Sequence, residues 1–244
     1  MVVIDNAVKP YLAGEKFDNG LRVRIAEKQK LFSRIEFLVR YAEGKKVIHM
    51  GCADHIPIIL EKVQNNTWLH KRIDQVAQKQ IGIDILPEAV EYIRKELGFV
   101  NILTLDIVKD PVPEEIKSDL WDCMILGEIV EHIDNPVEFL TEIRQKYAPF
   151  VREIVITVPN ALSVSNFYQA IGKNTEKINT DHRYWFTPFT MQKILIRSGF
   201  KPLYHEFATY YPLNKKKPVR NFLLRTLLVN RPALRGNLIM VAEF

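Results

Sequence analysis

A glycine and two aspartates stand at the ends of three successive apolar runs. Gly51 follows residues 47–50, Asp84 ends residues 81–84, and Asp106 ends residues 102–106. A carboxylate there can accept hydrogen bonds from ribose hydroxyls or an adenine amino group, and a glycine lets backbone N–H groups approach a ligand closely. Because open parallel sheets bind ligands at the carboxyl ends of their strands, the three residues together predict a nucleoside site.

Each of these residues also has a structural interpretation, which the sequence leaves open. Gly51 could be a turn glycine, Asp84 could cap the helix that begins at Pro87, and Asp106 could form an Asx turn. The order of the three, with helical patterns between them, favours a binding site. The fingerprint G-x-G-x-x-G is absent, since Ala53 and His55 follow Gly51 where further glycines would stand, and this weakens a dinucleotide interpretation.

The elements that must position these residues alternate between strand and helix patterns. This alternation predicts an α/β fold: a doubly wound, mostly parallel, seven-stranded sheet with helices on both faces. We expect strands over residues 46–52, 81–85, 101–105, 121–126, 152–158, 200–209 and 237–244. We expect helices over residues 21–41, 56–79 with a break at Asn65-Asn66, 87–97, 137–147 and 187–198.

Composition agrees with a globular protein. The 244 residues are 47% hydrophobic and 26% charged, with a net charge of +5 that is too small for a dedicated nucleic-acid binder. With no signal peptide, no membrane span and two separated cysteines, we expect a cytoplasmic protein. We expect an N-terminal arm and helix (1–44) and one catalytic domain (45–244), with lid or substrate elements near 160–187 and 211–236.

Four stretches carry a family resemblance. Residues 47–55 (VIHMGCADH), 81–85 (IGIDI), 105–107 (LDI) and 121–136 (WDCMILGEIVEHIDNP) resemble the successive motifs of class I S-adenosylmethionine-dependent methyltransferases. The fourth stretch and residues 181–187 (DHRYWFT) are similar to the small-molecule branch that includes ubiquinone-biosynthesis O-methyltransferases. The match covers residues 45–210 and the final strand.

This resemblance implies S-adenosylmethionine as cofactor, S-adenosylhomocysteine as product, and a role for each matched position. The implied cofactor-binding residues are His49, Gly51, Cys52, Ala53, Asp84, Ile85, Asp106, Ile107, Leu126 and Gly127. The chain departs from the family pattern at His49, where an acidic residue is common, and at Ala53 and His55. A catalytically silent S-adenosylmethionine-binding relative therefore stays an alternative.

Methyl transfer to a hydroxyl needs a base, and three residues are candidates for catalysis. His182 is the predicted general base, because it follows the expected lid and lies near Tyr184, Trp185 and Phe186. Glu128 and His132 follow the fourth strand and could share one face of a helical turn at the transfer site. Each candidate also has a structural alternative. His182 could be a polar turn residue, His132 could cap or pack the turn, and the carboxylate of Glu128 could lie on a solvated face. No histidine and carboxylate spacing indicates a metal site, and we expect none.

We therefore expect an enzyme that transfers a methyl group from S-adenosylmethionine to a small acceptor, at a hydroxyl, by in-line displacement. The acceptor could be sugar-like, lipid-linked or quinone-like, and we expect no nucleic-acid partner. The first alternative is a nicotinamide-dependent oxidoreductase. The basic segment 214–235 predicts a helix that packs on the domain with solvated charges; contact with an anionic membrane or a phosphorylated acceptor stays open.

Overall fold

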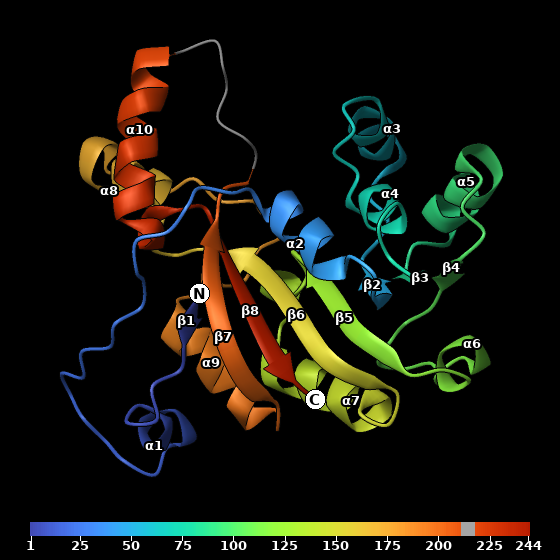
Figure 1. The fold of residues 1–244 in the computed structure, drawn as a ribbon, viewed down its shortest axis with the longest axis horizontal. Helices are drawn as coiled ribbons and strands as arrows, with labels where there is room; N and C mark the ends of the chain where they lie inside the picture. The colour runs from blue at the N-terminus through green and yellow to red at the C-terminus, as the bar shows by residue number, and fades with distance from the viewer. Residues whose placement is uncertain (211–217) are drawn as a thin grey trace.

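The sheet dominates the structure, a computed structural model that describes residues 1–210 and 218–244 (Figure 1). Its strand order is β1-β7-β8-β6-β5-β2-β3-β4. The strands are β1 (Val2–Val3), β2 (Lys46–Met50), β3 (Lys79–Asp84), β4 (Ile102–Thr104), β5 (Trp121–Gly127), β6 (Val151–Pro159), β7 (Lys201–Ala208) and β8 (Asn237–Glu243). Strands β2 to β6 pair in parallel, whereas β8 and β1 pair antiparallel with their neighbours. The predicted doubly wound sheet is confirmed; the two-residue β1 is an addition to the seven expected strands.

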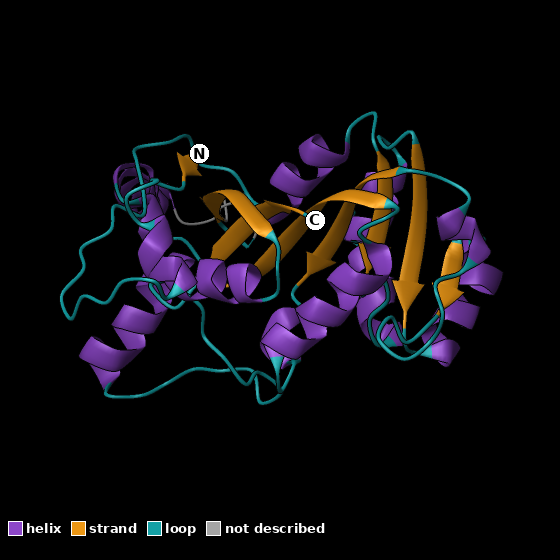
Figure 2. Ribbon diagram, turned by 90° about the horizontal axis from the view of Figure 1, so that it is seen from below, coloured by secondary structure: helices purple, strands orange, loops and turns teal. Residues whose placement is uncertain are grey.

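Helices lie on both sides of the sheet (Figure 2). They are α1 (Lys9–Ala13), α2 (Arg34–Ala42), α3 (Ile56–Gln64), α4 (Leu69–Asp74), α5 (Pro87–Leu97), α6 (Glu114–Lys117), α7 (Pro136–Tyr147), α8 (Val164–Lys173), α9 (Pro188–Arg197) and α10 (Pro218–Asn230), with 3-10 turns η1 (Val130–His132) and η2 (Pro232–Leu234). The expected break near Asn65-Asn66 separates α3 from α4, and Asn66 has a left-handed φ of 53°.

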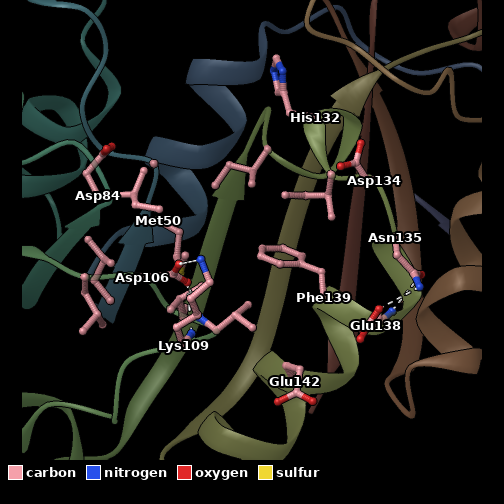
Figure 3. A pocket seen from close by; sticks show the side chains of 18 residues that line it. Met50, Asp84, Asp106, Lys109, His132, Asp134, Asn135, Glu138, Phe139 and Glu142 are labelled. Carbon is pink, nitrogen blue, oxygen red and sulfur yellow. Dashed lines mark hydrogen bonds and ion pairs between the residues drawn. The ribbon is translucent and has the colours of Figure 1, made fainter.

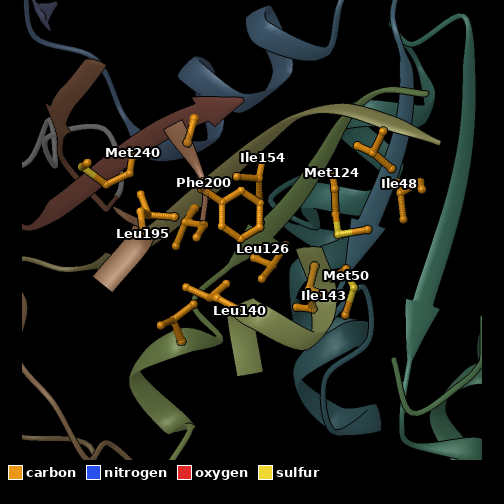
Figure 4. Close-up of a cluster of buried hydrophobic side chains, with 14 of the residues drawn as sticks. Ile48, Met50, Met124, Leu126, Leu140, Ile143, Ile154, Leu195, Phe200 and Met240 are labelled. Atoms are coloured by element: carbon orange, nitrogen blue, oxygen red, sulfur yellow. The ribbon is translucent and has the colours of Figure 1, made fainter. Parts of the chain in front are cut away.

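Strand periodicity divides the core between the two faces. Met124 and Leu126 of β5 pack with Leu140 of α7 and Leu195 of α9 in the larger cluster (Figure 4). The alternate residues Cys123 and Ile125 pack on the opposite face, against α2 and α4. Because successive side chains of a strand point to opposite faces, burial on both sides requires the nearly continuous apolar runs seen in the sequence.

The helix expected over residues 21–41 begins only at Arg34. Ser33 caps it, since its hydroxyl accepts from Glu36 N at 3.2 Å while Glu36 closes a capping box. Residues 20–32 form no helix and run along the molecule, where their carbonyls accept from other elements: Ile25 O lies 2.7 Å from His205 Nε2 and Gln29 O accepts from Arg235. The apolar spacing of this segment misled the prediction, because tertiary partners take up its backbone groups.

The later part of the chain follows the predicted order with small differences. Thr187 caps α9 and Gly199 follows it with φ +84°. The short helix α6 falls in the expected loop around Pro111 and Pro113. The basic segment forms α10 from Pro218 onward, and its residues 214–217 lie outside the described part of the chain. Within the described ranges, no helix has the length and apolar character to cross a membrane.

Candidate active site

The carboxyl ends of β2, β3 and β4 open onto one cleft of about 780 Å³, closed on its other side by η1 and α7. Figure 3 shows Asp84 and Asp106 on the strand side and Phe139 of α7 facing them. The cleft is lined by Met50, Gly51, Ile83, Asp84, Ile85, Leu105, Asp106, Ile107, Val108, Lys109, Ile129, His132, Ile133, Asp134, Asn135, Glu138, Phe139 and Glu142. The structure thus brings together the glycine and the two aspartates that the sequence singled out.

Gly51 begins the turn after β2 and must be a glycine. Its φ is +62°, and its N–H donates to Ile83 O of the neighbouring strand at 2.9 Å. A Cβ at this position would lie 2.9 Å from Cδ1 of Ile129, which also lines the cleft. The glycine therefore allows both the left-handed backbone and the close approach of η1 to the strand ends.

Asp84 connects the two turns at this edge of the sheet. Its Oδ2 accepts from Ala53 N at 2.8 Å and its Oδ1 accepts from Leu86 N at 3.1 Å. Burial raises the pKa of the carboxyl, against the opposing effect of these backbone donors. The carboxylate therefore holds these two turns while it lines the cleft beside the exposed Ile85, and it does not cap α5, whose N-cap residue Leu86 receives no side-chain cap bond.

Asp106 forms the Asx turn that was the structural alternative for this position. Its Oδ1 accepts from the backbone N–H groups of Val108 and Lys109, both at 3.1 Å, and Oδ2 pairs with Lys109 Nζ at 3.2 Å. Partial burial works against ionisation, but the contacts with Lys109 and Val108 outweigh it and hold the pKa of Asp106 below its ordinary value. Ile107 beside it is buried in the cleft wall.

Five of the predicted cofactor residues do not line this cleft: Ala53 and Gly127, and also His49, Cys52 and Leu126, whose side chains are buried. His49 Nδ1 lies 3.3 Å from His70 Nδ1, which in turn lies 2.6 Å from Gln80 Nε2. Burial, and then the neighbouring His70, lowers the pKa of His49, so the pair is neutral. His49 therefore belongs to a buried polar group behind the turn, where the family pattern has an acidic residue.

Glu128 leaves β5 in a strained conformation that the sequence did not indicate. Its φ is +62°, so it lies outside the helical turn expected there, and η1 begins only at Val130. Its N–H donates to Thr157 O at 3.0 Å, and its Oε1 accepts from Asn237 Nδ2 at 2.9 Å. Burial raises the pKa of Glu128, while the charge of Arg34 opposes that rise.

Arg34 is a site residue that the sequence reasoning missed. Its Nη1 donates to Thr157 Oγ1 at 3.4 Å and lies 3.0 Å from the position of a Cβ on Gly127. Gly127 therefore leaves room for a guanidinium beside the end of β5. The Ser33-x-x-Glu36 capping box was the signal that could have placed Arg34 at the first turn of a helix pointing toward the sheet.

Glu131, His132 and His182 form a cluster that reaches the cleft through His132. Glu131 is fully buried, and neither of its carboxylate oxygens has a hydrogen-bond partner among the described residues. The rings of His132 and His182 meet edge to face at 4.7 Å, and His182 Nδ1 also lacks a described partner. Burial raises the pKa of Glu131 to about 9, with the nearby Glu128 adding to the effect.

This cluster could hold a metal ion, which the sequence gave no reason to expect. One ligand atom from each of Glu131, His132 and His182 lies within 4.8 Å of the others. A carboxylate and two imidazoles suit several divalent cations. Spacing could not reveal the set, because His182 is fifty residues away along the chain and only the fold brings it to η1.

The segment between β6 and α9 places His182 against His132, which lines the cleft. Arg183 N donates to Glu131 O at 2.8 Å, and Tyr184 Oη donates to Asp134 O at 2.7 Å. Burial, followed by the neighbouring His132, lowers the pKa of His182. Phe186, expected near a substrate pocket, is instead part of the core.

Comparisons with known proteins agree with the fold. No family model matches the chain. It is similar to the mitochondrial ubiquinone biosynthesis O-methyltransferase of Schizosaccharomyces pombe, with 22% identity over 121 residues, which span 49% of this chain and 40% of that protein.

Among solved structures, the magnesium protoporphyrin IX methyltransferase of Synechocystis PCC 6803 with bound S-adenosylhomocysteine has a TM-score of 0.51 at 15% identity, covering 86% of this chain and 81% of that one. An S-adenosylmethionine-dependent methyltransferase from Mesorhizobium loti has a TM-score of 0.50 at 15% identity, covering 86% and 95%. A small RNA methyltransferase has a TM-score of 0.51 at 13% identity, covering 93% of this chain and 27% of that one. The chain thus has the Rossmann-like fold of S-adenosylmethionine-dependent methyltransferases, a fold whose neighbours act on both small molecules and RNA.

Proposed function

We propose that the chain is an S-adenosylmethionine-dependent methyltransferase acting on a small hydroxyl-bearing acceptor. The observation that carries this proposal is the meeting of Gly51, Asp84 and Asp106 in one cleft of a sheet with this strand order. The absence of further glycines after Gly51 disfavours a dinucleotide, and the fold neighbours favour the methyl donor.

The cleft supports a division of roles along the cofactor. Asp84 holds the ribose hydroxyls, the exposed Ile85 and the buried Ile107 flank the adenine, and Asp106 accepts from its amino group. The methionine end would lie toward Gly51 and Gly127, and the guanidinium of Arg34 beside Gly127 would be a cation for its carboxylate. The backbone of Cys52 and Ala53 contributes through the turn that Asp84 holds.

The reaction is an in-line displacement in which the acceptor oxygen attacks the methyl carbon. The carbon–sulfur bond breaks, its electrons return to sulfur, and the acceptor proton leaves for a base. His182 is that base, since its pKa is lowered and its ring stands against His132 beside the buried carboxylate of Glu131. Alignment of the two reactants in the cleft would supply much of the remaining acceleration.

A divalent cation bound by Glu131, His132 and His182 would give the unpartnered carboxylate of Glu131 a partner. Such an ion would supply Lewis-acid activation of an acceptor hydroxyl. The two roles of His182, ligand and free base, predict different behaviour. Activity lost in EDTA and restored by Mg²⁺, Mn²⁺ or Zn²⁺ supports the ligand role, whereas full activity in EDTA supports the base.

Calorimetry with S-adenosylmethionine, S-adenosylhomocysteine and NAD tests the proposal. We expect the first two to bind and NAD not to; the reverse result would make the chain a nicotinamide enzyme. Asp84→Asn should weaken S-adenosylhomocysteine binding about 10- to 100-fold, the value of a charged hydrogen-bond pair. The matched control Asp54→Asn changes a carboxylate whose ion-pair partner among the described residues is Lys62 of α3, and it should leave affinity within twofold.

The acceptor requires a second experiment. Sugar, quinol and lipid-linked hydroxyl compounds, together with a short RNA, would be incubated with labelled S-adenosylmethionine, and S-adenosylhomocysteine release would be measured. Cofactor binding without turnover on any of them would favour the non-catalytic alternative.

A further inference from the structure

Helix α10 (Pro218–Asn230) is an insertion between the last two strands whose apolar residues have few partners. Phe222 and Leu223 are 68% and 64% exposed, and Leu227 is also exposed, whereas Leu228 is buried. The helix stands away from the sheet at one end of the molecule and makes its main contacts with η2 (Figure 1). The helix therefore packs on the domain through Leu228, with Arg225 solvated as expected, but it also leaves three large apolar side chains exposed.

The segment that contains α10 is strongly basic. Residues 207–242 contain seven lysines and arginines and no aspartate or glutamate. Among the described side chains, Arg225 and Arg231 are exposed next to the apolar residues. Exposed aromatic and aliphatic side chains beside exposed arginines complement an anionic lipid surface, which offers both apolar acyl chains and negative headgroups.

One arginine of the segment has a different role and ties the helix to the domain. Arg235 is fully buried, and its guanidinium donates to Leu228 O at 3.1 Å, Phe207 O at 2.8 Å and Gln29 O at 2.9 Å. Two residues later, Asn237 donates to Glu128 at the candidate active site. The base of α10 is thus anchored near Glu128, while Phe222, Leu223 and Leu227 stay exposed.

We propose that α10 docks on an anionic lipid surface through Phe222, Leu223 and Leu227, with Arg225 and Arg231 facing the lipid headgroups. A second copy of the chain fits this surface less well, because two basic helices would place like charges against each other. The proposal concerns binding and does not depend on methyl transfer, although a membrane-docked α10 would bring the neighbouring cleft close to a lipid-linked acceptor.

Cosedimentation of the full chain with vesicles tests the proposal. We expect binding to vesicles of phosphatidylcholine with about 30% phosphatidylglycerol, little binding to pure phosphatidylcholine, and weaker binding at high salt. Phe222→Asp/Leu223→Asp should reduce the partition coefficient at least about tenfold. Arg225→Gln/Arg231→Gln should reduce it about 25-fold, at roughly fivefold for each cation removed.

Matched substitutions elsewhere separate docking from general effects. Phe17→Asp changes an 89% exposed phenylalanine in the N-terminal arm, and Arg24→Gln/Arg152→Gln removes two exposed arginines from other elements. Both controls should bind vesicles within twofold of the wild type, and circular dichroism melting would verify that all variants fold. Equal binding by Phe222→Asp/Leu223→Asp, or no binding by the wild type, would overturn the proposal. So would a wild-type dimer in light scattering that this variant abolishes, because a second copy would then occupy the surface.

Discussion

Replacing Glu131 by glutamine should remove a pH dependence of stability. The Glu131 carboxyl is fully buried without described partners, and burial, with help from Glu128, raises its pKa from 4.5 to about 9. The unfolded chain releases this proton at a lower pH than the folded chain, so stability falls as pH rises from about 4.5 to about 9. Each pH unit inside that window costs about 1.4 kcal/mol. Between pH 6 and pH 8 the wild type should therefore lose roughly 2–3 kcal/mol more than Glu131→Gln.

Urea unfolding followed by tryptophan fluorescence at pH 6, 7 and 8, in EDTA, measures this difference. The titration of histidines is common to both proteins and cancels in the comparison. Glu114→Gln, at an exposed carboxylate of α6, is the control and should follow the wild type. A difference between wild type and Glu131→Gln that stays constant from pH 6 to pH 8 would refute the reasoning, since it would mean that Glu131 is charged throughout. With a divalent ion added at pH 8, the wild type should gain stability and Glu131→Gln should not.

Three further substitutions address the turn, the base and the N-terminal helix. Gly51→Ala should cost about 2–4 kcal/mol in urea unfolding, because a left-handed φ and a 2.9 Å approach to Ile129 both oppose a Cβ. Gly98 also has a left-handed φ, +73°, but open space around it, so Gly98→Ala should lose only the stability that the strained backbone costs. If the two variants lost the same free energy of unfolding, the steric argument would be contradicted. His182→Ala should lower turnover about 100-fold or more while calorimetry finds S-adenosylhomocysteine affinity unchanged; normal turnover would exclude His182 from proton transfer. Ser33→Ala should cost about 1 kcal/mol in thermal unfolding, and a neutral result would mean that the cap is dispensable.

Much of the fold could be predicted because its elements carry local signals. Helix α5, expected over residues 87–97, begins at Pro87 as expected, and α9, expected over residues 187–198, follows its Thr187 cap. The segment 21–32 failed for the opposite reason: its apolar spacing suggested a helix, but distant partners such as Arg235 bind its carbonyls. Propensity is a weak guide where tertiary hydrogen bonds decide the backbone.

By itself the sequence determined which residues end the strands, because apolar runs and glycine turns are properties of neighbouring residues. From these it was correct to expect Gly51, Asp84 and Asp106 at one edge of a parallel sheet. Only the tertiary structure decided that Arg34 lies beside Gly127, that His49 pairs with His70 behind the turn, and that His182 meets Glu131. These contacts join residues many positions apart. Their energies depend on burial and on nearby charges in the folded chain, which the pattern of neighbouring residues does not show.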